Sequence, residues 1–320
     1  MGLGPDGLCC RCCPYFRPYC MAGDLNPARI FQGGRSMSIK PVVSAIEPKA
    51  VIEGAGVHLK RALGLNNEST AFDPFLLLDH FKSNNPQDYI AGFPWHPHRG
   101  IETITYMLSG SVTHGDSMGN SGIIESGDVQ WMTAGSGIIH QEMPQDNGTA
   151  QLNGFQLWAN LSASNKMMAP HYRDVKSTQI PSIELETGTL TKIISGNIDG
   201  IHGPVIGIVT DPVYLDISMQ PHMEYIFPIK KSYTLCTYVF EGSGQFGSTL
   251  APVSEEMLLL FGEGDRLRVH TQDNPVRFLL LSGKPIGEPV AWYGPIVMNT
   301  QKELDTAFRE YENGTFIKHK

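Results

Sequence analysis

Short apolar runs separated by glycine turns dominate this chain. Residues 101–106 (IETITY) and 131–139 (WMTAGSGII) are typical of strands, and glycines recur between residues 110 and 127 at hairpin spacing. With 34 glycines and 22 prolines in 320 residues, the pattern favours turns and strands over long helices. No stretch reaches the roughly 18 apolar residues of a membrane-spanning helix. We therefore predict an all-β fold without a transmembrane segment.

The pattern also repeats at long range. YMLSGS at residues 106–111 resembles YVFEGS at residues 238–243, an offset of 132 positions. ESGD at residues 125–128 resembles GEGD at residues 262–265, an offset of 137 positions. Each half therefore contains a strand, a glycine turn, a strand and a Gly-Asp turn. This repeat predicts two stacked β-barrels or sandwiches.

One helical pattern follows the second copy, between Lys302 and Tyr311. Its apolar residues recur at i, i+3, i+4 and i+7: Leu304, Ala307, Phe308 and Tyr311. Asn313-Gly314 is a typical helix end. We place the first barrel at residues 37–170 and the second at residues 171–300. Residues 301–320 form the C-terminal helix and tail.

Composition limits the classes of partner and compartment. Five of the six cysteines lie in residues 1–36, a Cys-rich extension without apolar periodicity that we predict to be disordered. Cys236 is alone in the remaining body, which indicates no disulfide framework and a reducing, intracellular location, predicted to be cytoplasmic. The formal net charge of −8, with no block of Lys or Arg, argues against direct nucleic-acid binding.

Two pairs of side chains carry the candidate chemistry: His96 with His98, and His140 with Glu142. A spacing of two places both members of a pair on the same face of a strand. Two neighbouring strands would then direct four ligands at one metal ion. Glu102 has the same parity as His96 and His98 and competes with Glu142, so spacing alone does not choose between the two carboxylates.

The repeat also makes a statement about the second half. The local offset is 132 positions for the first pair of candidate ligands and 137 for the second. Adding it gives Pro228, Lys230, Arg277 and Leu279 as the equivalent residues. These residues do not form a plausible set of ligands. We therefore predict that the second barrel is a metal-free structural copy.

Four longer motifs then resemble one known family. They are FPWHPHRGIET (93–103), GDVQWMTAGSGIIHQEMP (127–144), QLW (156–158) and GPIVMNT (294–300). The chain is identified by them as similar to the pirins, members of the cupin superfamily, from about Met37 to its C-terminus. The resemblance implies two stacked cupin barrels of the jelly-roll type. Pirins generally lack an extension like residues 1–36.

The resemblance also implies a ligand set. Pirins hold one iron through three histidines and one glutamate, which by position are His96, His98, His140 and Glu142. This favours Glu142 over Glu102 as the fourth ligand and makes Glu102 a residue that orients ligands or water. Such a nitrogen and oxygen donor set also suits Mn, Co, Ni or Cu.

Two functions follow from the resemblance. The first is a dioxygenase of the quercetin 2,3-dioxygenase type, which opens a flavonol ring with O2 and in which Glu142 is both ligand and base. The second is a non-catalytic, iron-dependent, redox-sensing transcriptional co-regulator that binds a transcription factor, and in a eukaryote the resemblance implies a nuclear location as well. Lys60, Arg61 and Arg99 are candidates for a charged patch that would favour the second function.

Overall fold

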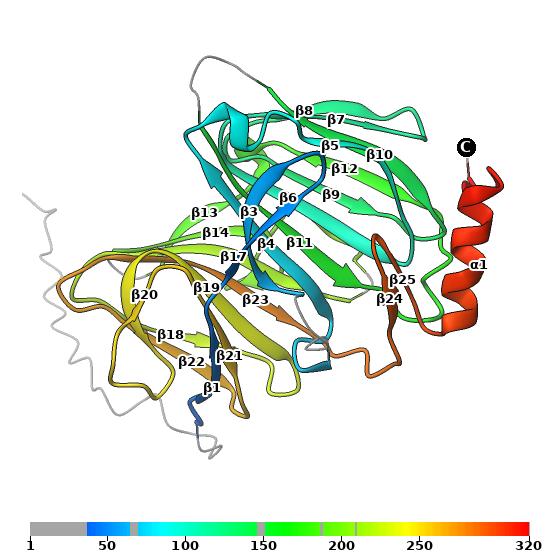
Figure 1. The fold of residues 1–320 in the computed structure, drawn as a ribbon. Coiled ribbons are helices and arrows are strands. Elements are labelled where there is room, and N and C mark those ends of the chain that lie inside the picture. Colours follow the sequence, from blue (N-terminus) through cyan, green and yellow to red (C-terminus); the bar gives the residue numbers. More distant parts are fainter. Residues whose placement is uncertain (1–36, 65–69, 146–150, 186–187, 209, 320) are drawn as a thin grey trace, which may run out of the picture. The chain divides into compact units, whose positions relative to one another are not determined.

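The computed structural model describes residues 37–64, 70–145, 151–185, 188–208 and 210–319. The disorder expected for residues 1–36 lies outside the described residues. Where it is described, the chain is built almost entirely of β-strands, with α1 (Gln301–Glu312) as its one α-helix (Figure 1). The all-β class predicted from the apolar pattern is confirmed.

The first half contains two antiparallel sheets. The larger has the order β12 (His171–Val175), β9 (Val129–Thr133), β6 (Ile101–Ser109), β11 (Leu152–Asn160), β4 (Phe75–Ser83), β3 (Val57–Leu63) and β2 (Lys49–Glu53). The smaller has the order β5 (Phe93–His98), β10 (Ile138–Pro144), β7 (Val112–Asp116) and β8 (Ser121–Ile124). Buried residues of both sheets, among them Leu59, Met107 and Val112, pack into one apolar cluster.

The second half repeats this arrangement strand for strand. Its large sheet has the order β1 (Val42–Ile46), β21 (Met257–Phe261), β19 (Thr234–Phe246), β23 (Val276–Gly283), β17 (Val213–Met219), β14 (Thr189–Ser195) and β13 (Ser182–Leu185). Beside it, β18 (Glu224–Pro228) pairs with β22 (Arg266–His270), which pairs with the end of β19, and β20 (Val253–Ser254) also pairs with β19. The internal repeat read from the sequence is thus a repeat of topology.

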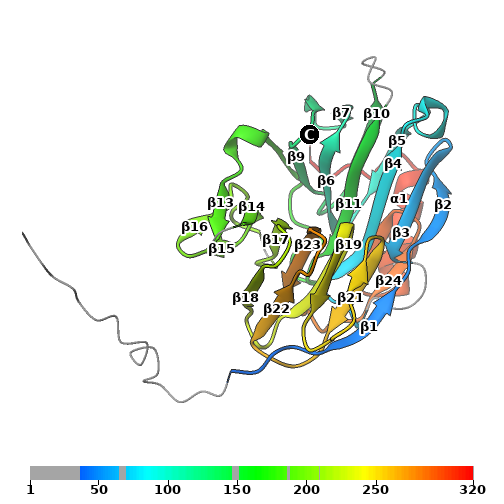
Figure 2. The same cartoon turned by 90° about the vertical axis from the view of Figure 1, so that its left-hand side faces the viewer.

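One strand is taken from the opposite end of the chain. In the first half, β12 pairs with β9 and follows β11 in the chain. The matching place beside β21 is filled by β1, which precedes the whole first half, and both views show it there (Figures 1 and 2). The large sheet of the second half therefore includes a strand that precedes the first half in the chain. Backbone pairing as well as side-chain packing joins the two halves.

The two large sheets share the main core. Tyr106, Trp131 and Phe155 from the first half are in one buried cluster with Tyr238 and Phe240 from the second. A hydrogen bond crosses the same boundary, because His80 Nδ1 lies 3.2 Å from the Tyr238 hydroxyl. The larger sheet of the first half therefore has one face toward the smaller sheet of its own half and the other toward the second half.

The C-terminal segment returns to the first half. It contains β24 (Ala291–Tyr293), β25 (Ile296–Met298) and α1, and its apolar residues pack with Ile139 of β10. Thr300 caps α1: its hydroxyl accepts from the Glu303 amide, and the Glu303 carboxylate accepts from the Thr300 amide. The predicted helix is thus confirmed.

The short elements complete the description. They are β15 (Asn197–Ile198), β16 (Ile201–His202) and two 3-10 turns, η3 (Pro86–Asp88) and η4 (Ser177–Gln179). Within the described ranges, the structure contains no helix with the length and apolar character needed to span a membrane.

Candidate metal centre

The three predicted histidines meet on neighbouring strands. β5 and β10 are antiparallel partners, with His96 opposite His140 and His98 opposite Ile138. The nitrogen atoms that the three imidazoles offer as ligands all lie within 4.8 Å of one another. A shift of register between His140 and Glu142 places Glu142 opposite Phe93. Because side chains alternate along a strand, His96 and His98 lie on the same face of β5. The pairing of β5 with β10 then brings His140 to them.

Backbone carbonyls orient two of the rings. Nδ1 of His96 donates to the Pro94 carbonyl at 2.8 Å, and Nδ1 of His98 donates to the Pro295 carbonyl at 2.9 Å. Because a carbonyl only accepts, this tautomer leaves a lone pair on each Nε2. The two Nε2 atoms lie 3.1 Å apart. Two lone pairs at this distance repel each other, and a cation between them would turn the repulsion into coordination.

His140 supplies the strongest test of the site. It is 1% exposed, and neither of its ring nitrogens has a hydrogen-bond partner among the described residues. Burial, together with nearby His96, lowers its pKa well below the ordinary value, and burial lowers the pKa of His98 to about 3. Both rings are therefore neutral near pH 7, the state that binds metal. The three residues fit a transition-metal ion.

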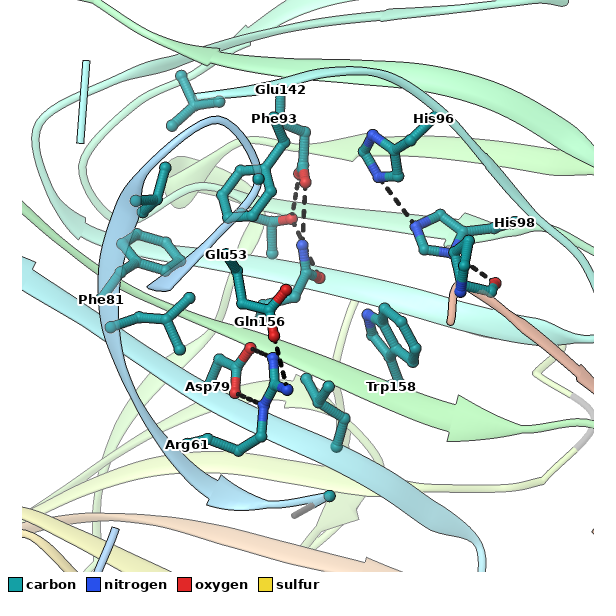
Figure 3. A pocket seen from close by; sticks show the side chains of 18 of the residues that line it. Glu53, Arg61, Asp79, Phe81, Phe93, His96, His98, Glu142, Gln156 and Trp158 are labelled. Carbon is teal, nitrogen blue, oxygen red and sulfur yellow. Dashed lines mark hydrogen bonds and ion pairs between the residues drawn. The ribbon is translucent and has the colours of Figure 1, made fainter. Parts of the chain in front are cut away.

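Glu142 lies on the same strand as His140, two positions further along β10. Its Oε1 accepts from the Thr105 hydroxyl at 2.7 Å, and its Oε2 accepts from the Gln156 amide at 3.0 Å (Figure 3). The group of mutually close ligand atoms contains the three histidines and does not include this carboxylate. The structure therefore shows a buried carboxylate beside the histidines, held by two donors.

Glu102 faces the other side of its sheet. Gly100, with φ of +79°, turns the chain between β5 and β6, and this turn breaks the parity counted from His98. Within β6, Glu102 and Thr105 point to opposite faces, and Thr105 contacts Glu142. The Glu102 carboxylate instead accepts from the Thr133 hydroxyl at 2.8 Å, and burial raises its pKa. The expected role of Glu102 beside the metal ligands is not supported by these contacts.

A cavity of about 580 Å³ opens beside the histidines, a volume typical of small-molecule sites. His96, His98, Glu142 and Gln156 line one part of it, and Figure 3 shows Arg61 and Asp79 on the opposite side of Gln156 from Glu142. Its remaining walls are mainly apolar: Val57, Leu59, Leu77, Phe81, Phe93, Val112, Leu152, Trp158 and Trp292. No pattern in the sequence indicates this cavity, because its lining comes from strands far apart in the chain.

The C-terminal segment supports the loop that follows His98. Arg99 is 2% exposed, and its guanidinium donates to Glu310 and to the Phe316 carbonyl, both at 2.8 Å. The same guanidinium lies 4.2 Å from the centre of the Phe316 ring. Together with the Pro295 carbonyl, these contacts join the His98 loop to residues far along the chain.

The expected basic patch does not form. Arg99 is buried against Glu310, Arg61 is paired with Asp79 inside the cavity, and Lys60 is paired with Glu256. Each of these cations therefore already has an acidic partner, and the three residues make no free charged surface.

The second half has apolar residues at the ligand positions. Phe227 lies opposite Leu267, as His96 lies opposite His140, and the Ile229 amide donates to the Asp265 carbonyl, which matches His98 opposite Ile138. The four equivalents are therefore Phe227, Ile229, Leu267 and Val269. Mapping by sequence offset was wrong, because turns of different length shift the register. These four side chains are hydrocarbon and offer no donor atom to a metal ion, and the metal-free second barrel stays a prediction.

Known proteins resemble the whole described body. The pirin family matches residues 56–159, and the pirin C-terminal cupin domain matches residues 214–317. A pirin-like protein of Caulobacter vibrioides is 41% identical over 282 residues, which cover 88% of this chain and 100% of the relative. A pirin-like protein of Solanum lycopersicum is 43% identical over 277 residues, covering 85% and 91%. The crystal structure of a quercetin 2,3-dioxygenase from Acinetobacter baumannii is 29% identical with a TM-score of 0.81, covering 87% and 99%.

Proposed function

The chain belongs to the pirin family of cupin proteins, and from this premise we propose that it is a metal-dependent dioxygenase of the quercetin 2,3-dioxygenase type. Its proposed substrates are O2 and a flavonol, a planar aromatic molecule. The proposed ligands are His96, His98, His140 and Glu142. Iron is the proposed metal, and Mn, Co, Ni and Cu are alternatives that the same donor set accepts.

One observation carries the proposal: two buried, neutral imidazoles, His98 and His140, meet the partly exposed imidazole of His96 beside a cavity of the size of a small aromatic molecule. Two observations support a bound cation: the nitrogens of His140 have no hydrogen-bond partner in the described part of the chain, and the Nε2 atoms of His96 and His98 face each other. The cavity reaches His96 and His98, so a substrate inside it would meet that cation directly. The name of the Acinetobacter baumannii relative supports a flavonol as the substrate.

The chain's own residues supply positioning and proton transfer. A transition metal, when bound, supplies a cation for a deprotonated substrate hydroxyl and a centre for dioxygen chemistry. Glu142 accepts the proton of that hydroxyl on Oε2 or Oε1, exchanging one of its hydrogen bonds from Thr105 or Gln156. Trp158 and Phe93 line the cavity with apolar surface that excludes water. A flat ring held between these walls is oriented before reaction.

Metal content and oxygen uptake together test the proposal. We expect the purified protein to hold one metal ion per chain and to consume O2 when quercetin is added. His98→Ala should abolish both, because it removes a ligand that faces the cavity. Bound metal without oxygen uptake would contradict the enzyme and favour the redox-sensing co-regulator.

Substitution of Glu142 tests its two roles separately. Glu142→Ala should lose metal and turnover together, whereas Glu142→Gln keeps an oxygen donor and should retain part of the metal without turnover. Metal is measured by atomic emission and turnover by oxygen uptake on the same samples. Full activity in Glu142→Gln would exclude Glu142 as the base.

A further inference from the structure

We propose that the cavity contains a second recognition site, formed by Glu53 and Arg61 and supported by Asp79, that binds a phenolic hydroxyl on an outer ring of the substrate. This inference rests on the proposed function, since it names the group by which the proposed flavonol is recognised away from the metal ligands. All three residues line the same cavity as His96 and His98.

Asp79 holds the guanidinium in a fixed position. Arg61 and Asp79 are direct cross-strand partners on β3 and β4, and the pair is bidentate: Nε and Nη2 each donate to a carboxylate oxygen at 2.8 Å. The Asp79 side chain is 6% exposed and that of Arg61 is 15% exposed. Both oxygens of Asp79 thus accept from Arg61 and its side chain is nearly buried, so we assign this residue the role of a support.

Glu53 leaves acceptor capacity open. One of its oxygens, Oε1, lies 2.9 Å from Arg61 Nη1, and its side chain is 42% exposed. Its other oxygen has no hydrogen-bond partner within the part of the chain that the structure describes. Arg61 uses three of its five N–H donors in these ion pairs. One acceptor and spare donors side by side match a hydroxyl group, which both donates and accepts.

The charge of the cluster selects against anions. Two carboxylates face one guanidinium, so the cluster carries a net negative charge when both are ionised. Burial raises the pKa of Asp79 to about 6 even beside Arg61, so this carboxyl is still mainly ionised near pH 7. A carboxylate or phosphate ligand would be repelled here, whereas a neutral phenol, donating to Glu53, would be attracted.

The walls between the two polar regions suit a flat aromatic molecule. Leu59, Leu77 and Trp158 line the cavity, and Figure 3 shows Gln156 between Glu142 and the Arg61–Asp79 pair. A molecule held by one hydroxyl at the histidines would extend over apolar surface and end at Glu53. The group recognised there is therefore on a ring other than the one that reacts.

Two flavonols separate this site from the metal site. Quercetin carries hydroxyls on both outer rings, whereas 3-hydroxyflavone keeps the reacting hydroxyl and carbonyl and lacks all the others. We would measure the Kd of each for the metal-loaded protein without oxygen, so that binding is read without turnover. Wild type should prefer quercetin, and Glu53→Ala should weaken quercetin about tenfold while leaving 3-hydroxyflavone within about twofold.

Glu224→Ala is the matched control. Glu224 is a similarly exposed strand glutamate that accepts from Arg268 at 2.8 Å in the second half, outside the cavity, and its loss should change neither Kd. If Glu53→Ala does not fold, Glu53→Gln, which keeps the volume but loses the charge, should weaken quercetin alone by about threefold.

The outcomes also separate this site from the proposed function. Equal weakening of both flavonols in the Glu53 variants, or of neither, would overturn the hydroxyl site. So would a wild type that shows no preference for quercetin. If the preference depends on Glu53 but quercetin causes no oxygen uptake, the recognition site stands and the dioxygenase proposal fails.

Discussion

The two halves have the same strand order but differ in the side chains at four equivalent positions, which are polar in the first half and apolar in the second. In the first half these positions hold His96, His98, His140 and Glu142. In the second half they hold Phe227, Ile229, Leu267 and Val269, which are buried in a continuous apolar cluster with Phe246. His114, which lies opposite Glu142, corresponds to Phe246, which lies opposite Val269.

The comparison separates the needs of the scaffold from those of the site. Since the second half keeps the strand order with only apolar side chains there, the fold does not require the ligands. Burying polar nitrogens that lack partners is unfavourable by about 1–3 kcal/mol for each group. The burial of His140 in the first half carries this unfavourable free energy, since its nitrogens have no partner among the described residues. We expect such a residue where a position serves binding.

The first prediction concerns a variant in which the first half carries the apolar side chains of the second. It should have the largest effect on metal content and activity. The combined variant His96→Phe, His98→Ile, His140→Leu and Glu142→Val reproduces the apolar set of the second half. Metal content should fall from one ion per chain to none, and oxygen uptake with quercetin should fall by at least about a thousandfold. Metal analysis and oxygen-electrode assays on the folded variant measure both effects. Undiminished metal content would place the ion elsewhere.

The second prediction breaks the apolar set instead. Phe227→Ala should destabilise the protein by about 3–5 kcal/mol, because it opens a cavity in a packed core. Urea unfolding followed by circular dichroism measures this change. Metal content per folded chain should stay the same as in wild type, since Phe227 belongs to the cluster of the second half. Loss of metal from the folded variant would mean that the two halves are coupled at the site.

Much of the fold and of the histidine motifs was predictable, because these features depend on short segments of the sequence. The resemblance to pirins, the all-β fold with two cupin domains and the C-terminal helix are confirmed. The HPH and HQE motifs place the proposed ligands on one face of each strand by strand alternation, a property of two or three neighbouring residues. Motif and topology are therefore accessible from the chain alone.

What the sequence did not reveal depends on contacts between distant strands. The Arg61–Asp79 pair needs the register of β3 on β4, and the support of His98 by the Pro295 carbonyl joins residues 197 positions apart. Glu102 was placed on the wrong face because one glycine turn resets the parity of the following strand. The equivalent positions of the second half were missed for the same reason, since turn lengths decide register.

The third prediction concerns the support that the His98 loop receives from the C-terminal segment. Arg99→Met removes the ion pair with Glu310, the hydrogen bond to the Phe316 carbonyl and the contact with the Phe316 ring, and should destabilise the protein by about 2–3 kcal/mol. Metal affinity should fall by about tenfold, because the segment that bears Pro295 orients His98.

Lys318→Met is the matched control for Arg99. Lys318 is the other cation paired with Glu310, at 2.9 Å, but it is partly exposed, so its loss should change stability by about 0–1 kcal/mol and leave metal affinity unchanged. Urea unfolding and competitive metal titration measure both variants. If the two variants lose metal equally, Arg99 has no special role in holding the His98 loop.

The fourth and smallest effect tests the boundary between the halves by pH. Burial lowers the pKa of His80 to about 4, below its ordinary value of 6.5, where Nε2 lies 3.0 Å from Asn153 Oδ1 and Nδ1 contacts Tyr238. The unfolded chain therefore binds this proton more readily, so stability that is present above pH 6.5 is lost as the pH falls toward 4. At pH 5 the loss from His80 is about 2 kcal/mol.

His80→Gln removes this titration while keeping a polar side chain of similar size. Urea unfolding at pH 7.5, 6 and 5 should show that the stability of wild type, relative to the variant, falls by about 2 kcal/mol across the range. His98 and His140 titrate in both proteins, so their contributions cancel in the difference. Parallel curves for the two proteins would show that His80 is not held neutral by the second half, and the boundary would then be open to water.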